Sequence, residues 1–215
     1  MLNNYYFKQD NSKEKHEIYV SCDSFFHLNN VFDSLLEIKI NEHCDLYFLS
    51  YKSCSVKINI LLNNPNQNVK VNLLLINNNS NQSCNVNIIH HANHTKSSFI
   101  GTCFAKNKGE IILNGNILIK KDTKQNYGEL LIKGKLFSKD ATISAVPQLL
   151  IDSNGCFVKH GVTIGNYDAN MLLYIMSRGF SENEAKSLIL QNEYNNFLPH
   201  LNDEVKKAIS ELFYE

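Results

Sequence analysis

Between residues 17 and 136 the sequence contains a series of short segments in which apolar and polar residues alternate. A period of two with many β-branched and aromatic residues is typical of half-buried β-strands. The sequence therefore predicts a mainly β fold for this part of the chain. The segments lie at 17–20, 36–40, 45–49, 55–61, 68–76, 84–89, 98–104, 110–119 and 128–136.

Asparagine-rich breaks at 63–68 and 77–82 separate some of these segments. Asparagine tolerates left-handed backbone and bonds its own main chain, so we read the breaks as turns. About ten strands separated by turns indicate a sandwich, a barrel or a solenoid. Tight corners at a nearly regular step favour a β-solenoid, although the repeat gives no clean consensus. A β-sandwich therefore stays open as the alternative.

The periodicity becomes helical beyond residue 165. Asp168 is placed to cap a first helix, and Gly179 is placed to end it. Ser181 and Glu184 have the spacing of a capping box for a second helix. A third helix is expected to start near Asp203. We expect these helices to pack on each other and on the sheet.

The change of period divides the chain into two predicted domains, a β-domain over 1–165 and a helical subdomain over 166–215. The chain has 21 basic and 21 acidic residues, so its charge gives no reason to expect a nucleic-acid partner. No apolar run approaches the roughly 18 residues of a membrane span. We therefore expect a cytoplasmic protein without a membrane partner.

Six cysteines are scattered along the chain and never form a CxxC pair. Without a signal peptide, this pattern predicts reduced thiols, most of them small buried strand residues. The cysteines are Cys22, Cys44, Cys54, Cys84, Cys103 and Cys156.

Three histidines cluster at His90, His91 and His94. In a strand, His90 and His91 would point to opposite faces, so we expect solvated imidazoles in a polar turn. A metal site there would need Cys84, Cys103 or a carboxylate from a neighbouring coil.

Cys156 and His160 form a second candidate site. On a strand both would face one side, about 13 Å apart at 3.3 Å per residue, too far apart for one metal ion. Taken alone, His160 is expected to be hydrogen-bonded and partly buried. Hydrolase elbows, zinc-protease motifs and phosphate loops are absent from the sequence, so we expect no enzyme and no bound nucleotide.

Several blocks in succession resemble the SufB/SufD family, the scaffold subunits of the SUF iron–sulfur cluster assembly machine. The blocks lie at 114–119, 124–126, 128–132, 145–152, 159–168 and 173–180, and they include Pro-Gln-Leu, Lys-His-Gly-x-Thr-x-Gly and Tyr-x-x-Ser-Arg-Gly. The resemblance implies a right-handed parallel β-helix followed by a small helical domain. It also implies that two β-helices pair and that each helical lobe binds the ABC-type ATPase SufC.

Within that family the chain is similar to the SufD branch. The resemblance places Lys159, His160 and Gly161 at the subunit interface, with His160 as a ligand for iron or a transient cluster. Ile151 stands where SufB carries its sulfur-accepting cysteine, which implies a SufB-like partner. Cys156 misses that position and is a secondary ligand candidate. The implied ATPase-docking residues are Leu172, Tyr174, Arg178, Phe180, Leu188 and Phe197.

Two alternatives stay open. One is a homodimeric SufBD-like scaffold that docks the ATPase without cluster chemistry. The other is an unrelated β-solenoid acting on carbohydrate, which would need paired carboxylates on one face. The acidic residues are sparse and show no evident stacking in the sequence.

Overall fold

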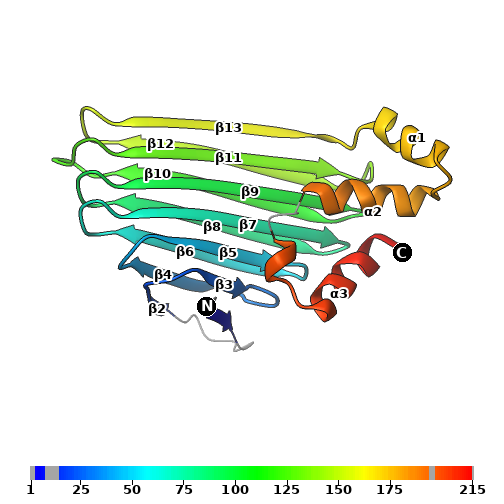
Figure 1. Ribbon diagram of the computed structural model, residues 1–215, viewed down its shortest axis with the longest axis horizontal. Helices are drawn as coiled ribbons and strands as arrows, with labels where there is room; N and C mark the ends of the chain where they lie inside the picture. The colour runs from blue at the N-terminus through cyan, green and yellow to red at the C-terminus, as the bar shows by residue number, and fades with distance from the viewer. Residues whose placement is uncertain (1–2, 8–14, 194–196, 215) are drawn as a thin grey trace.

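A computed structural model describes residues 3–7, 15–193 and 197–214 of the chain (Figure 1). Within these residues, thirteen strands are followed by three α-helices and one short 3-10 helix. The strands are β1 (Asn3–Tyr6), β2 (Lys15–Val20), β3 (Ser24–His27), β4 (Ser34–Ile40), β5 (Cys44–Ser50), β6 (Cys54–Leu62), β7 (Asn68–Asn78), β8 (Asn81–His90), β9 (Lys96–Lys106), β10 (Glu110–Ile119), β11 (Tyr127–Leu136), β12 (Thr142–Ile151) and β13 (Phe157–Asn166). The helices are α1 (Ala169–Ser177), α2 (Glu182–Glu193), η1 (Leu198–His200) and α3 (Asp203–Tyr214).

The chain alternates between two parallel sheets. Odd-numbered strands form one sheet in the order β1-β3-β5-β7-β9-β11-β13, and even-numbered strands form the other in the order β12-β10-β8-β6-β4-β2. Successive coils stack in register at steps of 20 to 32 residues, as when Lys15 pairs with Leu35 and Glu110 with Thr142. This arrangement confirms the predicted parallel β-helix and excludes the sandwich alternative, whose hairpins would be antiparallel.

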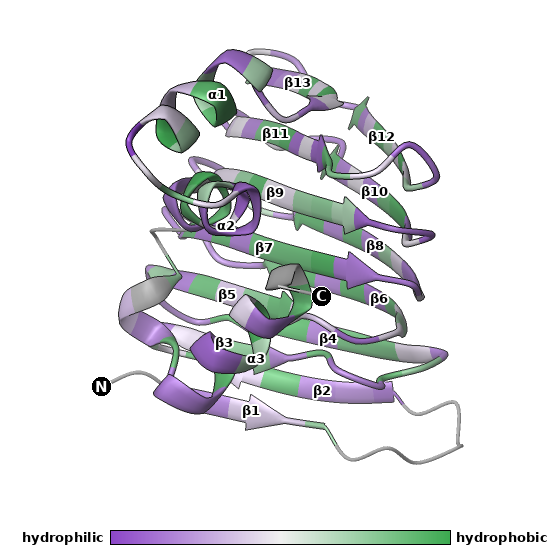
Figure 2. Cartoon of the chain, turned by 90° about the vertical axis from the view of Figure 1, so that its right-hand side faces the viewer, coloured by the Kyte–Doolittle hydropathy of each residue, from purple (hydrophilic) through white to green (hydrophobic). Residues whose placement is uncertain are grey.

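Alternation along each strand points one set of side chains into the lumen between the sheets. In β8 every second residue is buried, including Val86 and Ile88. Figure 2 shows hydrophobic residues alternating with hydrophilic ones along the strands. Burying each such aliphatic side chain contributes about 1.5 to 3 kcal/mol, so the lumen is the main core of the molecule.

The corners between strands rely on residues that tolerate left-handed backbone. The eight non-glycine residues with positive φ are mostly asparagine or aspartate, the residues that accept this conformation most readily. Asn66 and Asn79 lie in the two predicted asparagine-rich breaks, which confirms a corner in each. The second corner is shorter than predicted, because β7 extends to Asn78 and β8 begins at Asn81. The eight positive-φ residues are Asn30, Asp33, Asn66, Asn79, His94, Asn107, Asp122 and Gln125.

The predicted helix caps are present. The Asp168 carboxylate accepts hydrogen bonds from the first turn of α1, and Gly179 has a φ of 98° just beyond that helix. Ser181 and Glu184 exchange hydrogen bonds as a capping box, with the Ser181 N–H 2.8 Å from the Glu184 carboxylate. Among the described helices, none is long and apolar enough to cross a bilayer.

As expected, α2 and α3 pack against the outer face of the odd-numbered sheet, and α1 packs on α2. A second apolar cluster joins them to that sheet, beside the lumen core. Figure 1 shows the helices gathered at one end of the strands. The sheet supplies Phe25, Leu74 and Phe104 to this cluster, and the helical part supplies Leu190, Phe197, Val205 and Ile209. The division into two separately folding domains remains a prediction.

Candidate functional site

The last coil leaves one end of the β-helix open. β12 and β13 are the edge strands of their sheets at this end, and neither has a further strand beside it in the described chain. Val162 and Ile164 on β13 are each 37% exposed, and Ile151 on β12 is 44% exposed. The residues aligned with them in the preceding coil, such as Ile132 and Ile119, are buried in the lumen. We did not predict this open apolar end from the sequence. The sequence does carry a signal for it, because the alternation of apolar and polar residues continues to residue 164 and a helical pattern follows.

Register fixes the orientation of His160 on β13. His160 pairs with Leu130, which is buried in the lumen, and aligned residues of neighbouring parallel strands point the same way. The imidazole therefore faces the inner side of the open end, where it is exposed and has no hydrogen bond to a described residue. The expectation of a hydrogen-bonded, partly buried His160 was wrong, because no following coil covers it.

Lys159 and Gly161 flank His160 on the outer face. The Lys159 ammonium lies 2.8 Å from the Glu129 carboxylate of the preceding coil. The hydrogen bond to Glu129 raises the pKa of Lys159. A Cβ atom added to Gly161 would lie 3.4 Å from Leu131, in ordinary contact. The outer face thus anchors β13 to β11 by a charge pair while the inner face presents the imidazole.

Cys156 belongs to a column of inward corner residues. The column consists of Gln67, Thr95, Asn126 and Cys156. Each of them comes directly before a strand residue, and these strand residues pair with one another from coil to coil. Gln67 and Asn126 donate hydrogen bonds that hold the corners, and the Cys156 sulfur lies 3.8 Å from the Ser153 hydroxyl. The position of Cys156 is that of a corner residue in the last coil.

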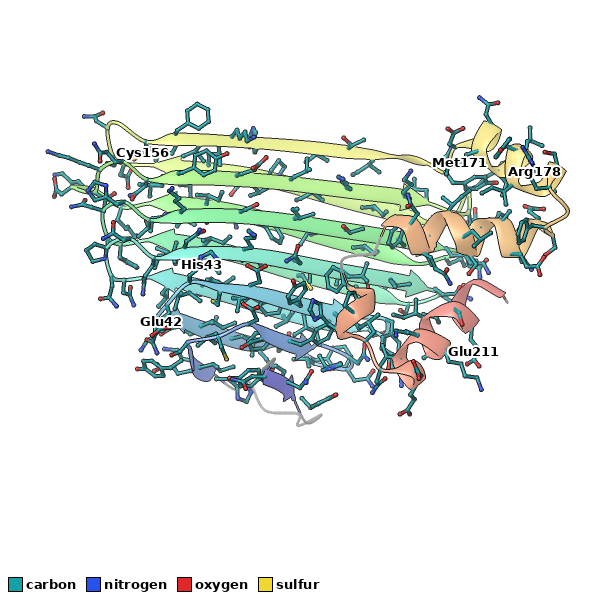
Figure 3. All side chains as sticks on the ribbon, viewed as in Figure 1. Glu42, His43, Cys156, Met171, Arg178 and Glu211 are labelled. Atoms are coloured by element: carbon teal, nitrogen blue, oxygen red, sulfur yellow. The ribbon has the colours of Figure 1, made fainter. Side chains whose placement is uncertain are left out.

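The structure does not bring Cys156 and His160 together. They lie four residues apart along one extended segment, about 13 Å by strand geometry. Figure 3 shows Cys156 at the end of the molecule opposite Met171 and Arg178. In the described parts of the chain, no three His, Cys, Asp or Glu side chains are grouped to hold a metal ion. This chain alone therefore offers a single imidazole at the open end.

His90 is a buried structural residue. Its Nδ1 and Nε2 atoms lie 2.7 Å and 2.9 Å from the hydroxyls of Thr95 and Ser97. Burial, together with nearby His91, lowers the pKa of His90 to about 4, so the ring is neutral at pH 7. The expectation of a solvated imidazole was wrong for His90 and correct for exposed His91 and His94, because β8 runs one residue further than predicted and turns His90 inward.

The central cysteines are buried, reduced thiols. Cys44, Cys54, Cys84 and Cys103 face the lumen. Burial raises the pKa of Cys103 to about 12, which keeps its sulfur protonated and a poor metal ligand. The prediction of small buried strand residues is confirmed for these four, and neither Cys84 nor Cys103 reaches the histidine cluster.

The six expected docking residues divide into two groups. Leu172 packs on Ala185 and Ile189, and Phe197 packs on Phe25 and Tyr47. Both side chains are buried inside the chain, which corrects their assignment to a docking surface. Tyr174, Arg178, Phe180 and Leu188 are exposed.

The exposed group lies on α1, in the turn that follows it and midway along α2. Leu173 and Tyr174 are more than half exposed, at 63% and 60%. The Arg178 guanidinium lies over the Tyr174 ring, 5.1 Å from its centroid, and donates a hydrogen bond to its hydroxyl. This contact places a cationic group beside the exposed Tyr174 ring.

Carboxylates on the even-numbered sheet are neutralised by lysines. Glu17 and Glu37 are stacked in register, which corrects the expectation of unstacked acids. Lys15 lies 2.8 Å from Glu17 and 3.2 Å from Glu37, and its hydrogen bond lowers the pKa of Glu17. A glycosidase acid needs a raised pKa, so this pair does not support carbohydrate hydrolysis.

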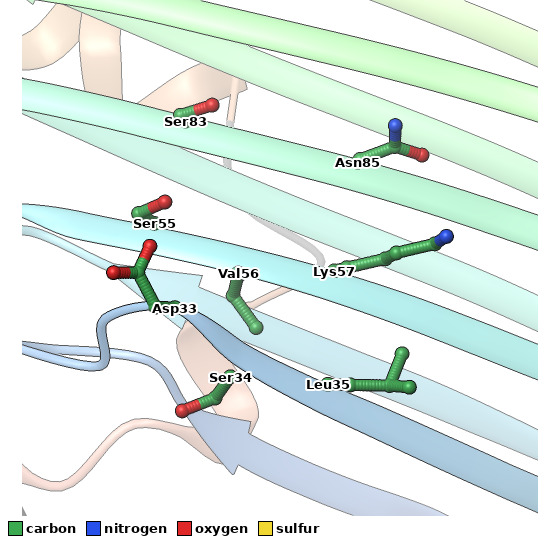
Figure 4. A pocket seen from close by; sticks show the side chains of 8 residues that line it. All are labelled: Asp33, Ser34, Leu35, Ser55, Val56, Lys57, Ser83 and Asn85. Atoms are coloured by element: carbon green, nitrogen blue, oxygen red, sulfur yellow. The ribbon is translucent and has the colours of Figure 1, made fainter. Parts of the chain in front are cut away.

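A groove on the same sheet face also lacks paired carboxylates. Figure 4 shows its lining side chains, among which Asp33 is the one carboxylate and Lys57 the one ammonium. The groove has a volume of about 470 Å³ and is lined otherwise by serine, asparagine and aliphatic groups. Nothing in this lining provides the acid and base that glycoside hydrolysis requires.

Comparison with known proteins agrees with this architecture. The family model for "SUF system FeS cluster assembly, SufBD core domain" matches residues 39–192. Proteins described as iron–sulfur cluster assembly SufBD family proteins from Staphylococcus haemolyticus, Staphylococcus epidermidis and Staphylococcus aureus are each 24% identical over 113 residues. Each match covers 53% of this chain and 24% of the relative. The matched region contains β13 and the helices α1 and most of α2, and with the parallel β-helix it establishes that this chain belongs to the SufBD family.

Proposed function

We propose that this chain is a SufD-like scaffold subunit of the SUF iron–sulfur cluster assembly complex, without enzymatic activity of its own. It pairs through the open end of its β-helix and docks a SufC-like ATPase through its helices. The cytoplasm is its expected location, and its free thiols suit a reducing compartment.

The observation that carries this proposal is the uncovered last coil. A pair of ten-residue edge strands presents unpaired backbone groups, a ready template for strand addition. Val162 and Ile164 add exposed apolar surface that a partner's coil would bury. Solenoid ends normally need a cap, and a second β-helix is the cap we propose.

The partner must also complete the chemistry. His160 supplies one imidazole for a nascent cluster, which is cargo of the complex. Iron in clusters is held chiefly by thiolates. Ile151 supplies no thiol, and the Cys156 thiol lies about 13 Å along the strand from His160. These features favour a SufB-like partner that contributes thiolates over a second copy of this chain.

The ATPase contact is assigned to the exposed patch on α1 and α2. Leu173, Tyr174, Phe180 and Leu188 supply apolar area, and Arg178 supplies a cationic group. Aromatic and arginine side chains are the groups enriched at energetically dominant interface positions. The buried Leu172 holds α1 on α2 and so supports the patch from beneath.

The deciding experiment is anaerobic co-purification with the SufB-like and SufC-like proteins of the same genome, followed by iron and sulfide analysis. We expect a stable complex with bound cluster, and much less cluster with His160→Ala. His91→Ala is the matched control, since His91 is exposed but lies in a different corner. Equal cluster content with wild type and His160→Ala would overturn the ligand role.

A second candidate is a homodimeric scaffold that docks the ATPase without cluster chemistry. Its support is that the described residues contain no group of three His, Cys, Asp or Glu side chains that could hold a metal ion. Retained stimulation of the ATPase by a homodimer that binds no iron would select this alternative.

A further inference from the structure

A cleft far from β13 is built from four separate parts of the chain. Tyr6 ends β1 and Phe7 follows it, His27 comes from β3, Tyr51 from the turn after β5, and Glu204 from the first turn of α3. The cleft has a volume of about 280 Å³. β1 and β13 are opposite edges of the odd-numbered sheet, so the cleft is separate from the open end. Figure 2 shows α3 lying beside the N-terminal coils.

Contacts within the fold hold the cleft in shape. The side-chain oxygen of Asn29 accepts the Tyr51 N–H at 2.8 Å, which fixes the turn after β5. The rings of Tyr6 and His27 are stacked with their centroids 4.1 Å apart. On the other side, the Asn202 side chain caps α3 by accepting the Val205 N–H at 2.8 Å. These contacts position the walls and leave the Glu204 carboxylate without a hydrogen bond to a described residue.

The charge of the cleft is negative. Glu204 is the carboxylate in its lining, and no lysine or arginine is among the described lining residues. Burial lowers the pKa of His27, so this imidazole is neutral at pH 7. Burial, with the nearby Glu204 and Tyr6, raises the pKa of Tyr51, so its phenol is neutral as well. Glu204 is thus the one formally charged side chain among the described lining residues.

The neutral groups of the cleft can also accept hydrogen bonds from a ligand. The His27 ring nitrogens have no hydrogen bond to any residue in the described chain, so one is free to accept. The faces and hydroxyls of Tyr6 and Tyr51 add aromatic surface, which attracts cations. An anion is disfavoured although α3 begins here, because Asp203 and Glu204 already complement the helix dipole.

We propose that this cleft binds a cationic organic group, a guanidinium or alkylammonium, with Glu204 as its charge partner and the aromatic rings as its walls. The neutral His27 imidazole accepts a hydrogen bond from the ligand. This site is independent of the proposed scaffold function.

The test is calorimetric titration of the full chain with Nα-acetyl-arginine amide and with Nα-acetyl-lysine amide. The citrulline counterpart of the first probe is the neutral control of the same shape. We expect saturable one-to-one binding of at least one cationic probe, and at least tenfold weaker binding of the citrulline compound. The two cationic probes distinguish a guanidinium from an alkylammonium preference.

Single-residue variants test whether the probe binds in this cleft. Glu204→Gln should weaken binding at least tenfold, whereas Glu211→Gln, on the same helix but paired with Lys207, should leave it unchanged. In NMR spectra the His27 ring signals should shift on titration while those of His160 stay in place. Absence of saturable binding, equal binding of the citrulline compound, or equal losses with the two variants would overturn the proposal. Unchanged circular dichroism and melting temperature would show that Glu204→Gln is folded.

Discussion

The Nδ1 atom of His90 lies 2.7 Å from the Thr95 hydroxyl, inside the lumen and on the far side of a tight corner. The Thr95 hydroxyl in turn lies 3.0 Å from the Asn126 side-chain oxygen in the next coil. A neutral imidazole thus links the end of β8 to the stacked corner residues. Because the His90 ring is neutral in this arrangement, we expect its protonation in acid to destabilise the coil.

We predict that His90 lowers stability at acidic pH. Its folded-state pKa of about 4 lies below the unfolded value near 6.5, so the unfolded chain binds a proton that the native chain does not. The stabilisation from neutral His90 is fully present above pH 6.5 and is lost as the pH falls toward 4. By pH 4.5 the free energy of unfolding has fallen by on the order of 2 kcal/mol. Urea denaturation of wild type and His90→Gln at pH 7.5 and 4.5 measures this change in the free energy of unfolding.

The comparison must isolate His90, because burial also lowers the pKa values of His27 and His91. His91→Gln is therefore the matched control and should keep most of the wild-type pH dependence. A His90→Gln chain with the same loss of stability between pH 7.5 and 4.5 as wild type would contradict the prediction.

Packing inside the lumen predicts that Gly101→Ala is destabilising. A Cβ atom at Gly101 would lie 2.7 Å from a methyl group of Leu113 and 3.4 Å from the Phe99 ring. Overpacking of this kind costs about 1 to 3 kcal/mol. Gly165→Ala is the control, because a Cβ there meets no atom within 4 Å. Thermal melting should separate the two variants, and equal melting temperatures would contradict the packing argument.

The capping box predicts that Ser181→Ala weakens α2. The Ser181 side chain bonds the Glu184 carboxylate at 2.7 Å and accepts the Glu184 N–H. Loss of such a cap costs about 0.5 to 2 kcal/mol. Ser210→Ala removes a serine inside α3 that bonds only the preceding turn, so it should be nearly neutral. Faster amide hydrogen exchange confined to α2 in Ser181→Ala is the expected local signature.

The two faces of β13 predict that a charge weakens association with the partner strongly on the inner face and only slightly on the outer face. Ile164→Asp places a carboxylate on the inner face that a partner coil would bury, whereas Thr163→Asp places it on the outer face. Burying an unpaired charge is costly, so Ile164→Asp should abolish association with the partner. Thr163→Asp should weaken it far less. Sedimentation velocity of each variant with the SufB-like protein measures the difference, and equal association would argue against pairing at this end.

Local patterns were enough to predict much of the secondary structure. Alternation located most of the strands from β2 to β11, and the capping residues Asp168 and Ser181 located α1 and α2. The short strands β1 and β3 were missed, because each has only four residues and carries little periodic signal. The ten-residue strand β12 was missed as well, and β13 was considered as a strand only around Cys156 and His160. His90 was misplaced by one residue at a strand end, which reversed the face on which it lies.

Local patterns in the sequence favoured a β-solenoid with helices after it and left a β-sandwich open, because alternation, turn chemistry and capping are relationships between residues a few positions apart. The motifs around His160 also indicated the SufB/SufD family. The packing of the folded chain showed that the strands stack in parallel coils, that His160 faces an open end, that Leu172 and Phe197 are buried, and that Tyr6, His27, Tyr51 and Glu204 share one cleft. Those outcomes depend on stacking between coils 20 to 32 residues apart and on helices folding back onto the sheet, which no local pattern encodes.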